Sequence, residues 1–558
     1  MLPMSTVESS QLNTNANVHV CQDTIIYDGF MVKHIHVSTP TGLVEKPVIC
    51  FEPNDPIIKS LQDISNMEEL YESEVQISPN DLYPHIKSIQ DKVSAGDYNL
   101  IELLVYLNEF FKTKLDQISN MGKSNKINFD NLNTVFSIGT KFIGYVHNNQ
   151  MVGSIVHSTR MCETMMGRMF EITGVVNMSL GSEIKQVQKN FYIMEFGGVR
   201  SLDDLEVRLL NSEDEEYLRT RGEVFKKFAK GAHYYEYLGT MCINTNHGYQ
   251  HFKADGRVMI DAIGFDKCVP SYLSVYKQSS TIVHSLDDEN LWMCWPYLFG
   301  FSFTTKRWGE IQIDQLRPIK FDNDAFDYLV LDSDIKNMMK ALIVNVKHSF
   351  KDIIGGKSGG CIFMLHGPPG VGKTLTCEAV AELLHKPLYS VTVGELGTNV
   401  ASLEKKLNDI LEIANSWDAV ILIDEADIFM EVRNKSDIER NGMVSIFLRL
   451  LERHQGVMFL TTNRNEDLDP AFKSRISIII GYEQLNFDSR HTVWTNLLKA
   501  AGITLNTEDI KMLASWEING RQIKNSIRMA QSLSLDKDYN PAGTCVTREC
   551  INKVLKFM

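Results

Sequence analysis

The sequence predicts an α/β fold for residues 321–558, preceded by a mixed, β-rich N-terminal region. Within residues 321–558, helical patterns alternate with five short, largely apolar stretches, at 361–365, 388–393, 419–423, 457–461 and 476–480. Strands that are apolar on both faces and separated by helices indicate a parallel sheet flanked by helices. A glycine-rich segment also lies between the first of these strands and a helical run, which is typical of a strand–loop–helix unit.

The elements follow in order along the 558-residue chain. Residues 1–60 are polar and predict a loose arm with a few strands, and 61–119 show helical spacing of apolar residues. Shorter strand-like runs, punctuated by Gly and Asn, fill most of 127–320, and 482–558 is predicted as helices. We therefore expect four parts: an arm with a helical segment (1–126), a β-rich domain (127–320), an α/β core (321–481) and a helical lid (482–558).

Composition narrows the class of protein. Hydrophobic residues make up 44% of the chain and charged residues 23%, which excludes a largely disordered, collagen-like or coiled-coil chain. The net charge is −14, and most of it falls in residues 1–320, with 39 acidic and 29 basic residues against 31 and 27 in 321–558. Such a chain is not drawn to phosphate backbones, so a protein partner is expected rather than nucleic acid.

The cysteines and the N-terminus predict a soluble, intracellular protein, most simply a cytoplasmic one. The ten cysteines are scattered without a CxxC pair, and the histidines show no metal-ligand spacing. No zinc site is therefore expected from the sequence. Residues 1–20 contain no Lys or Arg and no apolar core stretch, and no run approaches 18 apolar residues, so neither a secretory leader nor a membrane span is predicted.

The glycine-rich segment matches the pattern GxxxxGK[ST]. Its residues are Gly367, Pro368, Pro369, Gly370, Val371, Gly372, Lys373 and Thr374. Glycines in this position let backbone N–H groups surround phosphates, and the helix that follows adds its N-terminal dipole. Lys373 is expected to reach the β- and γ-phosphates of ATP, and the Thr374 hydroxyl to ligate Mg²⁺. The alternative, a plain glycine turn before a helix, does not explain the complete pattern.

Two acids end the third apolar strand. Asp424 lies at its carboxyl end, where open α/β sheets bind ligands, and is expected to hold Mg²⁺ through water. Glu425 is expected to act as the general base that activates water. As an alternative, both acids are a solvated strand terminus or a helix N-cap. Asp427, two residues further on, is predicted to be structural.

Three further polar residues are candidates for the catalytic site. Asn463 follows the next apolar strand and is expected to orient the water, unless it belongs to a polar turn. Arg475 is a candidate to stabilise charge on the transferred phosphoryl group, or else forms a surface salt bridge. Arg521 begins a helix in 482–558 and is expected to sense the γ-phosphate from the lid, or else is an exposed residue at a helix start.

The order and spacing of these motifs resemble the AAA family of ATPases, over about residues 330–558. Several phrases before that region, such as 191–209 and 256–261, resemble a largely fungal subgroup of AAA ATPases with an uncharacterised N-terminal region. The resemblance implies an AAA+ P-loop core, ATP and Mg²⁺ as cofactors, and a ring, usually a homo-hexamer, in which Arg475 acts on a neighbour's nucleotide. In one respect the chain departs from many AAA unfoldases, because 393–398 has no aromatic residue where they carry a substrate-threading motif.

The function expected from this reading is ATP hydrolysis by a mechanoenzyme that remodels a protein partner. Two alternatives remain open. One is a nucleic-acid motor or loader with the same ATP-hydrolysing domain, and the other is a nucleotide-gated scaffold with little turnover.

Overall fold

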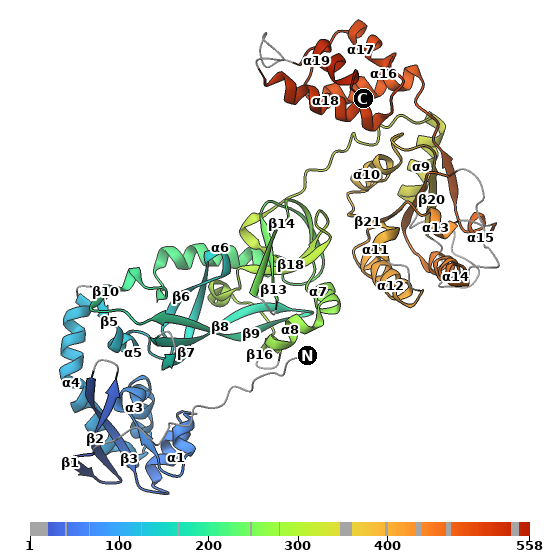
Figure 1. Cartoon of the computed structure of the whole chain (residues 1–558). Helices are drawn as coiled ribbons and strands as arrows, with labels where there is room; N and C mark the ends of the chain where they lie inside the picture. Colours follow the sequence, from blue (N-terminus) through green and yellow to red (C-terminus); the bar gives the residue numbers. More distant parts are fainter. Residues whose placement is uncertain are drawn as a thin grey trace.

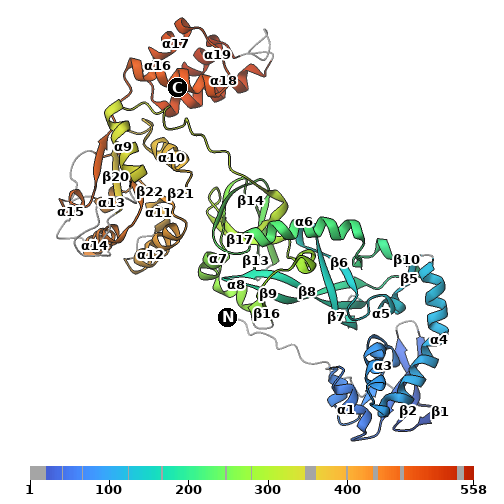
Figure 2. The same ribbon diagram turned by 180° about the vertical axis from the view of Figure 1, so that it is seen from behind.

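The structure, a computed structural model, describes most of the chain: residues 20–39, 42–65, 67–123, 125–164, 167–245, 248–277, 280–345, 360–396, 400–430, 438–464, 470–536 and 546–557. Within these ranges the strands form five sheets. The N-terminal unit and the C-terminal helices lie at opposite ends of the molecule (Figure 1), and the view from behind shows the same order (Figure 2). Among the described helices there is no candidate for a membrane-spanning segment.

The first unit is an antiparallel sheet covered by helices. Its strands, in the order β1-β2-β3-β4, are β1 (Val20–Tyr27), β2 (Phe30–Thr39), β3 (Gly42–Phe51) and β4 (Gln76–Ile77). Its helices are α1 (Pro56–Gln62), α2 (Pro79–Leu82), α3 (Ile86–Ser94) and α4 (Ile101–Lys123). Phe30, Leu103 and Phe111 belong to one buried apolar cluster. The expected loose arm is thus largely a sheet with its own core, because β2 and β3 pair over their full length.

The β-rich region contains two larger antiparallel sheets. The six-stranded sheet has the order β11-β6-β7-β8-β9-β16, and the seven-stranded sheet has the order β14-β13-β18-β17-β15-β12-β19. The strands of the six-stranded sheet are β6 (Lys141–Val146), β7 (Gln150–Thr164), β8 (Gly167–Leu180), β9 (Glu183–Met194), β11 (Arg208–Leu209) and β16 (Ser280–Val283). Those of the seven-stranded sheet are β12 (His233–Tyr237), β13 (Thr240–Thr245), β14 (Gly248–Lys253), β15 (Gly256–Ile260), β17 (Tyr297–Ser302), β18 (Arg307–Gln312) and β19 (Leu316–Arg317).

Short elements complete this region. They are the paired strands β5 (Lys126–Asn128) and β10 (Val199–Ser201), the helices α5 (Leu132–Val135), α6 (Ser212–Phe228), α7 (Ala262–Cys268) and α8 (Pro270–Lys277), and the 3-10 turn η5 (His147–Asn149). Helix α6 carries three acidic residues in its first turn, which is capped by the Asn211 side chain. Most buried residues of both large sheets belong to one apolar cluster, so the two sheets share a core.

The α/β core confirms the predicted parallel sheet. Its strands are β20 (Cys361–His366), β21 (Leu388–Thr392), β22 (Val420–Asp424), β23 (Val457–Thr462) and β24 (Ile478–Gly481). Their order is β21-β22-β23-β20-β24, and every neighbouring pair is parallel. The helices are α9 (Ser333–Asn345), α10 (Lys373–Leu384), α11 (Val393–Leu396), α12 (Val400–Ser416), α13 (Asp427–Met430), α14 (Ile438–Arg453) and α15 (Pro470–Lys473). Parallel strands bring their carboxyl ends to one edge of the sheet, where β20, β22 and β23 all end beside one another.

The helical lid also follows the prediction. It consists of α16 (Phe487–Ala500), α17 (Thr507–Ala514), α18 (Gly520–Ser534) and α19 (Arg548–Leu555). Asn486, Asn506 and Asn519 each cap one of these helices through the side-chain oxygen, which satisfies backbone donors that the first turn leaves unpaired. Trp494 is fully buried in the lid's own apolar cluster. The exact limits of the four parts, at 126, 320 and 481, stay a prediction.

The β-rich region packs on the α/β core through an aromatic contact. Phe301 of β17 stacks on Tyr389 of β21, with ring centroids 5.4 Å apart. Trp417, which follows α12, lies 5.7 Å from Phe301 and 5.8 Å from Trp308 of β18. Its indole N–H donates to Oδ2 of the buried Asp261, at 2.7 Å. This contact joins the β-rich region to β21, the strand next to the one that carries Asp424.

We expect Trp417→Phe to destabilise the chain by about 1–3 kcal/mol, because it removes the donor to a buried carboxylate oxygen while most of the aromatic packing remains. The midpoint of thermal unfolding of the full chain measures this, with Trp516→Phe as the control, since Trp516 is 38% exposed in the lid. Equal midpoints for the two variants would contradict the importance of the Asp261–Trp417 hydrogen bond.

Candidate nucleotide site

The predicted phosphate loop connects the carboxyl end of β20 to the first residue of α10. Gly367, Gly370 and Gly372 have φ values of +143°, +78° and +108°, a region that glycine enters without the strain that a Cβ causes. A Cβ at Gly367 would also lie 2.3 Å from the carbonyl oxygen of Tyr482. A glycine-rich turn directly before a 12-residue helix is an arrangement that binds phosphate.

Lys373 lies at the centre of this loop. Its Nζ donates to the carbonyl oxygens of Gly367 and Pro368, at 2.6 and 3.0 Å, and to Oδ1 of Asn463 at 2.7 Å. Burial lowers the pKa of Lys373, while the nearby Asp424 and Asp427 act in the opposite direction. The amine is thus a buried donor, held where the loop carbonyls and the end of β23 meet.

The two acids lie at the end of β22, beside β23. Asp424 accepts a hydrogen bond from the Thr461 hydroxyl, and the backbone N–H of Glu425 donates to the same hydroxyl oxygen at 3.0 Å. Glu425 has φ = +57°, which costs a non-glycine residue on the order of 1–3 kcal/mol. Its side chain is exposed, so the turn presents this carboxylate to solvent at the edge of the site. Asp427 instead accepts from the Thr462 hydroxyl, which agrees with the structural role predicted for it.

The lid reaches the site through the first turn of α18. The Gly520 N–H donates to the Gly370 carbonyl at 3.0 Å, and a Cβ at Gly370 would lie 2.7 Å from the Asn519 side chain. Arg521 is exposed in that turn, and its charge is one of the influences that lower the pKa of Lys373. Arg521 is thus an exposed residue at a helix start, on the side of the lid that contacts the phosphate loop, and its expected role at the γ-phosphate stays a prediction.

Arg475 is placed differently from the other candidates. It follows α15, donates to the Ala471 carbonyl at 2.7 Å, and forms an ion pair with Glu452 near the end of α14. This is the salt bridge that the sequence left open as its alternative. Ser477, two residues further on, donates its backbone N–H to the Ile362 carbonyl near the amino end of β20. The phosphate loop follows the carboxyl end of that strand, so Arg475 lies apart from the site of its own chain.

Sequence reasoning overlooked three residues that shape the site. Thr461 positions both acids, Asn519 packs on Gly370, and the Tyr482 hydroxyl hydrogen-bonds the Thr376 hydroxyl at 2.7 Å. Thr461 stands two residues before Asn463, and its place at the carboxyl end of a strand was the available signal. Asn519 and Tyr482 carried no comparable signal, because their neighbours are set by the packing of the lid and of β24.

The residues present fit a nucleotide with Mg²⁺. The loop supplies positive-φ glycines and a buried ammonium group for phosphate. The carboxylate of Asp424 ends β22 and is close enough to Lys373, the residue before Thr374, to raise its pKa. Carboxylate and hydroxyl oxygens are the protein ligands that Mg²⁺ takes alongside substrate phosphates. Thr374 and Asp424 would hold the ion, which neutralises charge on the phosphates when bound.

Comparison with known families agrees with this geometry. Residues 363–484 match the model of the ATPase family associated with various cellular activities (AAA), and residues 117–213 match a domain of unknown function, DUF7025. Residues 363–484, with β20 to β24 and the phosphate loop, are an AAA ATPase domain. The second match adds no activity to the β-rich region.

Individual relatives cover only part of the chain. The pachytene checkpoint protein 2 homolog of Homo sapiens is 27% identical over 184 residues, which are 27% of this chain and 42% of that protein. The AAA domain-containing protein FIGL1 of Arabidopsis thaliana is 26% identical over 189 residues, 32% of this chain and 28% of that protein. A crystal structure of the FIGL-1 AAA domain in complex with ADP is 19% identical and covers 43% of this chain and 86% of that one, with a TM-score of 0.34. The chain thus spans less than half the length of the curated relatives.

Proposed function

We propose that this chain is an ATP-hydrolysing AAA mechanoenzyme that works as a ring and remodels a protein partner. The observation that carries the proposal is the convergence of Lys373, Asn463 and Asp424 at one edge of the sheet, with α18 of the lid docked on the phosphate loop. A lid in direct contact with the loop is a means to convert nucleotide exchange and hydrolysis into movement.

Each residue has a role in this proposal. Lys373 and the loop bind the β- and γ-phosphates, and Thr374 and Asp424 hold Mg²⁺. Glu425 removes a proton from the attacking water, while Asn463, held by Lys373, orients that water. Arg521, in the lid, senses whether the γ-phosphate is present. The positive-φ turn at Glu425 and the hydrogen bond from its backbone N–H to the Thr461 hydroxyl hold the backbone from which this carboxylate extends.

The position of Arg475 is an argument for a ring. Within one chain Arg475 pairs with Glu452 and lies apart from the site, so we propose that it leaves this pair to act on a neighbour's nucleotide. A guanidinium supplied in trans raises the rate of phosphoryl transfer about 10³–10⁵-fold in other enzymes.

The partner is proposed to be a protein, and residues 1–320 are proposed to choose it. That region carries most of the acidic excess, and an acidic surface repels nucleic acid and attracts basic protein surfaces. The nucleic-acid motor is the weaker alternative for this reason. The nucleotide-gated scaffold is weaker because both acids of the catalytic turn are present.

Mg²⁺-dependent phosphate release from ATP by the purified chain tests the proposal. We expect the specific activity to rise with protein concentration as subunits assemble, and single- or double-stranded DNA to leave it unchanged. Absence of turnover at every concentration, together with a long-lived ATP complex, would favour the scaffold. Salt-sensitive DNA binding with stimulated turnover would favour the nucleic-acid motor.

A shared active site makes a sharper prediction. Arg475→Ala and Lys373→Ala chains are each expected to be inactive alone and to recover part of the activity when mixed, because an intact phosphate loop can then face an intact arginine. Steady-state phosphate release from mixtures at several ratios measures this. Arg453→Ala is the matched control, since Arg453 ends α14 and has no proposed role. Mixtures that stay inactive while both chains co-assemble would count against a shared site.

A further inference from the structure

A buried cluster of three metal-ligating side chains lies in the β-rich region, outside the nucleotide site. One ligand atom each of His147, Cys242 and Glu310 lie within 4.8 Å of one another. The His147 side chain is 7% exposed and that of Glu310 is 1% exposed, and Cys242 is fully buried. Buried ionisable groups are costly unless they are paired or coordinate a metal.

The fold assembles this cluster from three distant segments. Cys242 of β13 and Glu310 of β18 face each other across an antiparallel pair, which brings side chains on one face to about 4.5–5.5 Å at Cβ. His147 comes from η5, the turn that joins β6 to β7. Its ring is sandwiched between Tyr249 and Tyr297, with centroids 4.2 and 4.1 Å away, so its orientation is held by packing.

The polar atoms of the cluster are only partly satisfied. The Tyr272 hydroxyl donates to Oε1 of Glu310 at 2.5 Å. His147 Nε2 and Glu310 Oε2 are 2.9 Å apart, yet neither makes an aligned hydrogen bond. Two buried polar atoms without hydrogen-bond partners, which point into the same small space beside a thiol, call for an explanation. A metal ion that accepts a lone pair from each atom supplies one.

We propose that His147, Cys242 and Glu310 bind a divalent transition-metal ion, with zinc as the favoured metal. Imidazole nitrogen, thiolate sulfur and carboxylate oxygen are the three ligand types that zinc takes, at about 2.0–2.3 Å. A mixed nitrogen, sulfur and oxygen set is a poor match for Mg²⁺ or Ca²⁺, which prefer oxygen alone. Tyr272 then acts as the outer partner that orients Glu310.

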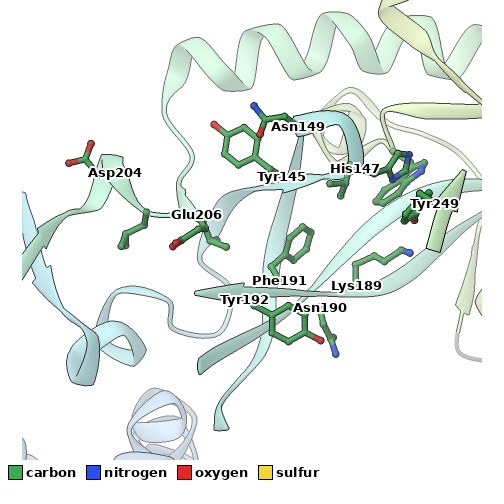
Figure 3. A pocket seen from close by; sticks show the side chains of 14 residues that line it. Tyr145, His147, Asn149, Lys189, Asn190, Phe191, Tyr192, Asp204, Glu206 and Tyr249 are labelled. Carbon is green, nitrogen blue, oxygen red and sulfur yellow. The ribbon is translucent and has the colours of Figure 1, made fainter. Parts of the chain in front are cut away.

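One of the three ligands, His147, borders a cavity. His147 lines a cavity of about 630 Å³ together with Lys189, Tyr249 and Trp295, and Figure 3 shows the His147, Tyr249 and Lys189 side chains gathered at one end of it. Three protein ligands leave a fourth position for water or a small ligand. No zinc site is predicted from the sequence, because these ligands are about 70–100 residues apart and regular metal motifs place ligands a few residues apart.

The competing interpretation is a metal-free His147–Glu310 ion pair beside an inert thiol. Zinc content and cobalt spectroscopy of the full chain separate the two. After dialysis against a chelator, we expect the wild-type chain to retain about one zinc per chain. After replacement of zinc by Co²⁺, we expect a thiolate-to-cobalt charge-transfer band in the near ultraviolet, which requires a Co–S bond.

Three variants test the assignment of the ligands. Cys242→Ser is expected to lose the charge-transfer band and the retained metal, and Tyr272→Phe to weaken Co²⁺ binding about 10–100-fold, as loss of an outer partner does elsewhere. Cys294→Ser is the matched control, because Cys294 is buried in the same apolar cluster and is not one of the three ligands. It is expected to keep both the band and the zinc.

The outcomes are decisive even where a variant fails to fold. Wild-type protein without retained zinc and without the cobalt band overturns the proposal and leaves the ion pair. A band that survives in Cys242→Ser assigns the metal to other cysteines and also overturns it. If Cys242→Ser does not fold, Glu310→Gln replaces it as the test, since the amide keeps the shape and can still accept the Tyr272 hydrogen bond. This variant is expected to lose the retained zinc, and zinc retention at the wild-type level would overturn the proposal. None of these readouts depends on ATP turnover.

Discussion

Replacement of Glu425 by glutamine is expected to lower ATP turnover by about 10²–10⁴-fold while ATP remains bound. The amide keeps the shape of the side chain but cannot remove a proton from water, and general-base catalysis contributes a factor of this size. The backbone contact from Glu425 to Thr461 involves no side-chain atom of Glu425, so the turn and the neighbouring Asp424 are expected to keep their positions.

Two measurements separate this effect from a general loss of structure. Phosphate release gives the turnover, and titration with a fluorescent ATP analogue gives the affinity, which we expect to change little. Glu483→Gln is the control, because Glu483 is an exposed carboxylate beyond β24 and has no proposed role in the reaction. Unchanged turnover in Glu425→Gln would reject Glu425 as the base. The same variant, held with ATP in its native cells, also offers a means to capture the protein partner.

Replacement of Lys373 by alanine is expected to abolish nucleotide binding at ordinary ATP concentrations. Lys373 is buried and makes three hydrogen bonds within the loop and to Asn463. Hydrogen bonds that involve a charged group contribute about 1.5–3 kcal/mol each, so loss of even one to phosphate lowers affinity roughly 10–150-fold. Turnover is expected to fall with binding.

The control for this variant is Lys386→Ala. Lys386 follows α10 at its other end and pairs with Asp418 at 2.8 Å, and a surface pair of this kind contributes little. We expect Lys386→Ala to bind the ATP analogue as the wild type does. Wild-type affinity in Lys373→Ala, with an intact thermal unfolding transition, would disprove the assigned role of the loop.

The α/β core was predictable because its signals are local. The loop 367–374 is contiguous, and each strand of the core is a short apolar run between helical patterns, so neither depends on knowing which strands are neighbours. The location of Asp424 and Asn463 at one edge of the sheet could also be predicted, since both lie at the ends of strands of one parallel sheet and the carboxyl ends of such strands lie at one edge. The structure places β22 and β23 side by side and brings Asn463 to Lys373.

The N-terminal half was less predictable because antiparallel pairing is non-local. The alternation of polar and apolar residues in 1–60 indicates strands, yet does not show that β2 and β3 pair over their full length or that helices from 56–123 cover them. In the same way, nothing near Asp261 in the sequence points to Trp417, which lies beyond α12 in another part of the chain.

The sequence by itself determined that this protein has a nucleotide site, because a phosphate loop is one contiguous segment and the acids directly follow a strand. Both features can therefore be identified without knowledge of the tertiary structure. Only the tertiary structure decided three matters: Arg475 is bound to Glu452 and apart from its own site, α18 rests on Gly370, and His147, Cys242 and Glu310 meet in the β-rich region. Each depends on contacts between segments far apart in the chain. Such contacts are set by sheet order and by helix packing. Neither can be predicted from the local pattern of side chains along one chain.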